Sequence, residues 1–164
     1  MPERGAGADL PALGPRGEGW VALQGSLVLV VVATAVFGAD WPRAWKSQLL
    51  IVGTVVLVAG AGPALIGARS LGTALTSLPH PREVAALRDG GVYRFVRHPI
   101  YGGLLLIALG LSLCSSPWTL APTALLALLL MGKSAREERW LTERYPEYPA
   151  YRERVPHRFL PFMW

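Results

Sequence analysis

The segment HPIYGGLLLIALGLSLCSSPWTLAPTALLALLLMG, residues 98–132, contains no formally charged side chain. Arg97 precedes it and Lys133 follows it. A Ser-Ser-Pro break at residues 115–117 divides it into two apolar arms. Serine is a favoured N-cap and proline a favoured first helical residue, so the break predicts the start of a second helix. We therefore expect a helical hairpin that enters a membrane and returns, with both charged ends on one side.

The composition also indicates a membrane protein. Of 164 residues, 52% are hydrophobic and only 16% charged, which is too apolar for an ordinary soluble domain. Two more charge-free segments lie between Glu18 and Asp40 and between Lys46 and Arg69. A helix needs roughly 20 apolar residues to cross a bilayer. The sequence predicts an all-α integral membrane helical bundle of about four transmembrane helices, the last two a tight hairpin. The expected spans are residues 20–38, 48–68, 100–114 and 117–132.

The flanking residues are predicted to form a tail, a loop and a strap. Residues 1–19 are rich in Gly and Pro and predict a flexible tail, which leaves 20–164 as a single domain. Residues 69–97 predict a polar loop with a short interfacial helix at 70–77. Residues 133–164 predict a cytoplasmic tail. Within this tail, the last helix continues to residue 145, and residues 146–164, the strap, lie on the interface as an amphipathic segment.

Two features of the first two spans need separate interpretation. The first span could instead be a secretory signal, with Ala33-Thr34-Ala35 as the cleavage site, but a second span follows almost at once and favours an anchor. The second span contains four glycines, which predict close packing against another helix. They are Gly53, Gly60, Gly62 and Gly67.

The positive charges are distributed unevenly. With four crossings, fourteen of the 16 Lys and Arg residues lie on the side of the two termini, which the positive-inside rule makes cytoplasmic. Three crossings would place the seven basic residues from Lys133 onward outside. We expect a bacterial-type inner (plasma) membrane, with both termini in the cytoplasm. Basic residues beside apolar spans contact lipid head groups, so the net charge of +5 does not predict nucleic-acid binding. No obligate protein partner is predicted.

Cysteine and histidine usage argues against a metal site. Cys114 is the single cysteine, which excludes an internal disulfide and any multi-cysteine centre. His80, His98 and His157 are far apart in the sequence. The sequence predicts no metal.

The ends of the hairpin hold the candidate chemistry. Arg97 and His98 place two donors at the N-terminus of the emerging helix, a location suited to a carboxylate. Glu137 and Glu138 follow the other arm and could accept hydrogen bonds from a ligand. The alternative for the acids is a solvated helix face, with Lys133 paired to Glu137 four residues later. The alternative for His98 is an interfacial hydrogen-bonding residue.

At these residues the chain resembles a known group. Residues 91–103, GVYRFVRHPIYGG, are similar to the G-x-Y-R-x-x-R-H-P-x-Y-x-G signature of the isoprenylcysteine carboxyl methyltransferase and phospholipid methyltransferase group. The Arg136-Glu137-Glu138 element, Tyr148, Tyr151 and the residues 154–162 resemble the isoprenylcysteine enzymes in particular. The resemblance covers about residues 70–162, and the two motifs together are fairly specific.

This resemblance implies an integral membrane methyltransferase that uses S-adenosyl-L-methionine. The cofactor is expected between the histidine motif and the two glutamates, at the cytoplasmic face. The implied cofactor-binding residues are His98, Tyr101, Gly103, Glu137 and Glu138, and the implied catalytic residues are Arg97, His98 and Arg154. One departure is that the chain has Pro-Glu-Tyr-Pro at 146–149 where the group usually has Gly-Glu-x-Tyr, which leaves the shape of the strap open.

The methyl acceptor and two other functions stay open. Prenylated cysteine, a phospholipid amine, a small thiol or a lipophilic metabolite could each accept the methyl group. A carboxylate needs no general base, whereas an amine or thiol does, and His98 is the nearby candidate. A sterol-reductase-like protein that uses NADPH ends in a similar histidine-proline-tyrosine patch. A non-catalytic scaffold would use both motifs only to anchor helices.

Overall fold

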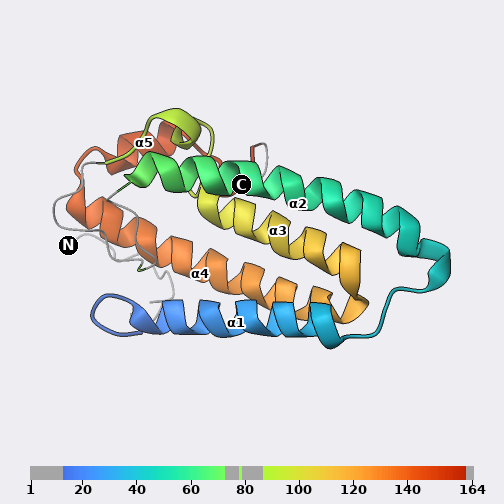
Figure 1. Cartoon of the computed structure of the whole chain (residues 1–164). Helices are drawn as coiled ribbons and strands as arrows, with labels where there is room; N and C mark the ends of the chain where they lie inside the picture. The colour runs from blue at the N-terminus through green and yellow to red at the C-terminus, as the bar shows by residue number, and fades with distance from the viewer. Residues whose placement is uncertain (1–12, 73–77, 79–86, 162–164) are drawn as a thin grey trace.

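The computed structural model describes residues 13–72, 78 and 87–161, and the regular elements in this part of the chain are helices. The all-α fold is therefore confirmed (Figure 1). The elements are α1 Glu18–Phe37, α2 Arg43–Leu71, η2 Gly91–Arg94, α3 Pro99–Ser115, η3 Pro117–Thr119, α4 Leu120–Arg144 and α5 Tyr148–Arg154, where η marks a 3-10 helix.

The length and apolar character of the helices make the chain a membrane protein. Among the described residues, three helical segments are long and apolar enough to cross a bilayer: Glu18–Phe37, Arg43–Leu71 and Pro117–Arg144. The helix α3 has 17 residues, about 25 Å of rise, and is the short member. Large apolar side chains point outward, as Leu29 and Phe37 do with 71% and 86% of their surface exposed. Such a surface suits lipid rather than water.

The helices α3 and α4 form the expected hairpin. Ser116 accepts a hydrogen bond from the backbone N–H of Trp118 at 3.3 Å, and Pro117 follows as the first residue of η3. Pro122 lies in the first turn of α4, where its missing N–H costs no helical hydrogen bond, so the helix continues. Figure 1 shows the start of α3 and the end of α4 at the same end of the bundle, together with α5.

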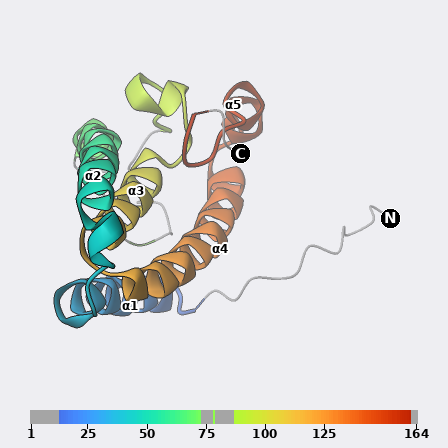
Figure 2. The same ribbon diagram turned by 90° about the vertical axis from the view of Figure 1, so that its right-hand side faces the viewer.

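Interlocking glycines hold α2 against α3. Gly60 lies against Gly103, and Gly53 lies against Gly110; a Cβ atom on any of the four would come within 2.7 Å of a backbone oxygen of its partner. The missing side chains therefore let the two backbones approach closely, which is how helices commonly associate in membranes. By contrast, α1 packs on α4, on the other side of the bundle (Figures 1 and 2). Figure 2 shows the four helices arranged in a curved layer.

Two helices extend beyond the apolar segments from which they were predicted. The helix α1 begins at Glu18, inside the expected tail, and α2 begins at Arg43, before residue 48, the predicted start of the second span. Helix growth adds one hydrogen bond per residue, so α2 continues until Pro42 at one end and Gly72, with φ of +51°, at the other. Residues 70 and 71 of the predicted interfacial helix belong to α2, and residues 73–77 and 162–164 lie outside the described part of the chain.

Candidate functional site

The strap crosses the beginning of α3 and holds it by backbone hydrogen bonds. The N–H of Arg97 donates to the carbonyl of His157 at 3.0 Å, and that of His98 donates to the carbonyl of Arg158 at 2.8 Å. A Cβ atom at Gly102 would collide with the backbone of Phe159, so glycine is required there for the strap to lie this close. The strap thus places a basic residue of its own, Arg158, beside the histidine motif.

Glu138 is the centre of a buried ionic cluster, in the charged part of α4 beyond the apolar span. Its Oε1 accepts from Arg97 Nε at 3.0 Å and contacts His98 Nε2 at 3.1 Å. Arg158 binds both carboxylate oxygens, at 3.2 and 3.0 Å. Burial opposes ionisation of this carboxyl, but the hydrogen bond to His98 and the charges of Arg158 and Arg97 prevail, and the pKa of Glu138 falls to about 2.

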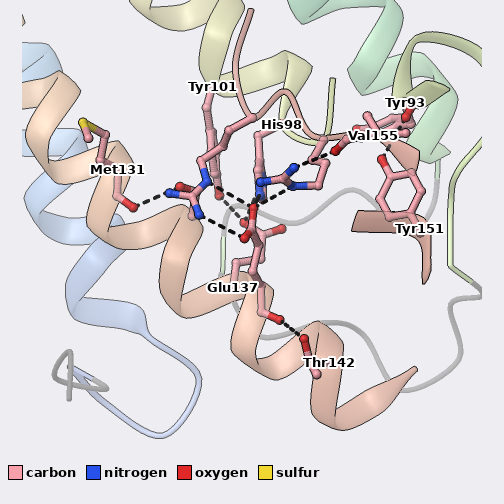
Figure 3. A network of polar contacts seen from close by, with 12 residues as sticks. Tyr93, His98, Tyr101, Met131, Glu137, Thr142, Tyr151 and Val155 are labelled. Atoms are coloured by element: carbon pink, nitrogen blue, oxygen red, sulfur yellow. Dashed lines mark hydrogen bonds and ion pairs between the residues drawn. The ribbon is translucent and has the colours of Figure 1, made fainter. Parts of the chain in front are cut away.

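Glu137 has different surroundings from its neighbour. Its Oε2 accepts a hydrogen bond from the hydroxyl of Tyr101 at 2.8 Å and lies 3.7 Å from Nδ1 of His98. The rings of His98 and Tyr101 are stacked, with centroids 5.4 Å apart and planes 3° from parallel. The side chain of Glu137 is 25% exposed, against 5% for Glu138. Figure 3 shows His98 and Tyr101 pointing from α3 toward Glu137 on α4.

Five of the residues predicted for the site are brought together. They are Arg97, His98, Tyr101, Glu137 and Glu138. The solvated-face alternative does not hold for Glu138 or for Lys133, which are both buried. The predicted residue Gly103 faces α2, where it packs against Gly60.

Arg154 lies apart from the ionic cluster, in an open groove. Its guanidinium pairs with Asp89 at 3.3 Å, and both side chains are more than half exposed. The groove has a volume of about 430 Å³. Its lining residues are Asp89, Gly90, Arg94, Tyr151, Arg154 and Val155. Val155 links groove and cluster, because its carbonyl accepts a hydrogen bond from Arg97 at 2.6 Å.

Two residues of this region were not predicted. Arg158 was one of several basic residues in the strap, and nothing in its spacing marked it as a partner of Glu138. The sequence marks Tyr148 only as part of a motif. It is 1% exposed, and its hydroxyl has no hydrogen-bond partner among the residues that the structure describes. Burial, and then the charge of Glu138, raise the pKa of Tyr148 well above its usual range.

The comparisons with known proteins agree with the motifs. Residues 49–148 match the family model described as phospholipid methyltransferase, which is more than half of the chain. The chain is also 32% identical over 138 residues to the cobalt-zinc-cadmium resistance protein CzcN of Cupriavidus metallidurans. That match covers 81% of this chain but only 60% of the relative. By the family match, this chain belongs to the phospholipid methyltransferase family, which includes the isoprenylcysteine carboxyl methyltransferase-like membrane enzymes.

Proposed function

We propose that the chain transfers a methyl group from S-adenosyl-L-methionine to a lipophilic acceptor at the cytoplasmic face of the inner membrane. The observation that carries this proposal is the meeting of the two hairpin ends. His98 and Tyr101 from the first arm lie within hydrogen-bond distance of Glu138 and Glu137 from the second. The two motifs thus form one cluster although the sequence separates them by 36 to 40 residues.

The residues at this cluster fit the cofactor chemically. Glu137 is partly exposed and can accept hydrogen bonds from an amino group or from ribose hydroxyls. The hydroxyl of Tyr148 is a buried polar atom with no hydrogen-bond partner among the described residues. A buried hydroxyl in that state is unfavourable unless a ligand or water binds it. When bound, S-adenosyl-L-methionine supplies an activated methyl group on a positively charged sulfur.

The chain's own residues then have distinct tasks. Glu138 is already bonded to Arg97, His98 and Arg158, so it orients these three side chains rather than a ligand. His98 and Tyr101 stack beside Glu137, and the Tyr101 hydroxyl orients its carboxylate. Because the methyl group is already activated, the protein needs mainly to align the acceptor with it and exclude water.

For the acceptor, we propose a carboxylate on a lipid-like molecule, as in isoprenylcysteine. Arg97 is engaged with Glu138 and with the carbonyl of Val155, whereas Arg154 is more than half exposed in the neighbouring groove. Arginine binds carboxylates through paired hydrogen bonds, so Arg154 can orient such an acceptor by exchanging its weak contact with Asp89. An amine or thiol acceptor would instead require His98 as a base.

Calorimetry on the detergent-purified full chain tests the cofactor. We expect binding of S-adenosylhomocysteine, the product form, and no binding of NADPH. Glu137→Gln should lower the affinity about tenfold or more, since a charged hydrogen-bond acceptor is lost. Glu143→Gln, on the exposed side of the same helix, is the matched control and should bind normally. Binding of NADPH alone would support a reductase, and binding of neither would support a scaffold.

Methyl-transfer assays identify the acceptor. Radiolabelled S-adenosyl-L-methionine is supplied with a prenylated cysteine, a phosphatidylethanolamine or a small lipophilic thiol. We expect transfer to the prenylated cysteine, with loss of most activity in Arg154→Met. Transfer to the amine or the thiol alone would leave the methyltransferase proposal standing and reject the carboxylate.

A further inference from the structure

Lys133 is wholly buried, although it is the first charged residue after the apolar part of α4. Its ammonium donates a hydrogen bond to Oε1 of Gln24, on α1, at 2.5 Å. The same nitrogen lies 5.2 Å from the centroid of the Tyr101 ring, in the range of a cation–π contact. A buried ammonium is costly unless its surroundings compensate the charge. Gln24 and Tyr101 therefore hold Lys133 in a defined position.

The contacts of Lys133 continue directly into the candidate site. Tyr101 meets Lys133 with its ring face and donates its hydroxyl to Glu137 at 2.8 Å. Its ring also stacks on His98. The orientation of Tyr101 is thus determined on one face by Lys133 and at the hydroxyl end by Glu137. We therefore expect a displacement of the ammonium to alter the packing next to the partly exposed carboxylate of Glu137.

One hydrogen-bond partner of Lys133 comes from outside the family match. Gln24 lies in α1, whereas the match covers residues 49–148. We propose that Lys133, held by Gln24, is a positioning residue that keeps Tyr101 and Glu137 oriented for the cofactor, so that α1 contributes to cofactor affinity as well as to anchoring. This inference rests on the proposed methyltransferase function.

Binding of S-adenosylhomocysteine to the full chain in detergent tests the inference. In Lys133→Met, a side chain of similar length fills the same space without the charge, so the ligand-free melting temperature should stay the same or rise. The dissociation constant should rise about tenfold. Gln24→Leu should show a smaller loss of about threefold to fivefold, and Gln24→Glu, which keeps an acceptor for the ammonium, should stay within about twofold of the wild type. In transfer assays, KM for S-adenosyl-L-methionine should rise more than kcat falls.

Lys46→Met is the matched control, because Lys46 is exposed and pairs with Asp40 near the start of α2. It should bind as the wild type does. Normal affinity in both Lys133→Met and Gln24→Leu would overturn the inference, as would a loss of affinity that only accompanies a large drop in melting temperature. If Lys133→Met does not fold, the comparison of Gln24→Leu with Gln24→Glu decides: equal affinity in these two variants would overturn the inference. A wild type that binds no S-adenosylhomocysteine would refute the proposed function, and this inference with it.

Discussion

Adjacent carboxylates at the end of the hairpin have opposite surroundings. Glu138 is enclosed by two arginines and a histidine. Glu137 accepts a hydrogen bond from Tyr101, lies 3.7 Å from Nδ1 of His98 and is partly exposed. A carboxylate whose oxygens already accept several hydrogen bonds has little capacity left for a ligand. We therefore propose that Glu138 stabilises the fold and that Glu137 binds the cofactor, and mutations at the two positions should separate these properties.

Glu138→Gln should destabilise the folded protein. The change leaves Arg97 and Arg158 without their shared counter-ion, and breaking a buried ion pair from one side typically costs about 3–5 kcal/mol. Denaturant unfolding in detergent measures the loss, with Glu143→Gln as a control that should change stability by less than about 0.5 kcal/mol. Equal stability in the two variants would mean that the cluster around Glu138 contributes nothing to the fold.

The lowered pKa of Glu138 predicts a loss of stability in acid. The pKa is about 2 in the folded protein and 4.5 for an ordinary carboxyl, so the charged form is favoured by folding. This contribution, about 3 kcal/mol, is complete above pH 4.5 and is lost as the pH falls from 4.5 toward 2. Melting temperatures between pH 6 and pH 3 should fall in the wild type and fall less steeply in Glu138→Gln. Parallel curves would contradict the assignment.

The buried hydroxyl of Tyr148 provides a test with two opposite effects. Tyr148→Phe removes a polar atom that has no partner within the described residues, so the ligand-free protein should gain about 1 kcal/mol of stability. If the hydroxyl binds the cofactor, affinity for S-adenosylhomocysteine should fall about fivefold or more. Thermal unfolding and calorimetry on the same preparation measure both effects. A gain in stability with unchanged affinity would exclude Tyr148 from the site.

At the level of elements, the glycines of α2 differ in what surrounds them. Gly60 lies against the backbone of α3, whereas a Cβ atom at Gly62 would meet nothing within 4 Å. Gly60→Val should therefore separate α2 from α3 and cost about 2–4 kcal/mol, since the nearest obstacle is backbone that cannot move aside. Gly62→Ala is the matched control and should be neutral or slightly stabilising. Unfolding in detergent distinguishes them, and equal stability of the two variants would refute the interlocking arrangement.

The sequence could predict the elements better than their ends or their contacts. Charge-free segments identified the helices α1, α2, α3 and α4, because the absence of charge over such a length has a strong physical cause in the bilayer. The start of α2 at Arg43 was missed because a helix can continue beyond the apolar run with charged residues in its first turn. The roles of Gly102 and Gly103 were not separable either. Both lie in one motif, yet one faces the strap and the other faces α2.

At the level of the whole molecule, the candidate site forms where the two ends of the α3–α4 hairpin meet. The proximity of His98 to the two glutamates could be inferred from the uncharged hairpin between them. The contribution of Arg158 could not, because it depends on how the strap crosses α3 by hydrogen bonds from residues 97 and 98. Hydrogen bonds between backbone groups can form with almost any side chain, so they leave no recognisable pattern in the sequence. Tertiary contacts of the strap are thus the part of the site that sequence reasoning missed.

The α3–α4 hairpin and the distribution of basic residues together predict the orientation of the protein in the membrane. The end of the bundle that holds the site also carries the start of α1 and the end of α4, whereas the α1–α2 link, residues 38–42, lies at the opposite end (Figure 1). A green fluorescent reporter at the C-terminus should therefore be cytoplasmic and fluorescent. The positive-inside rule places the end of the bundle with most Lys and Arg residues in the cytoplasm. The 38–42 link is at the other end, so an alkaline phosphatase reporter there should be outside the cytoplasm and active. As a control, exchanging the two reporters should silence both. Reporters that place the link and the C-terminus on the same side would mean that α3 and α4 together cross the bilayer only once. The two ends of the hairpin would then lie on opposite sides of the membrane, and the candidate site would be refuted.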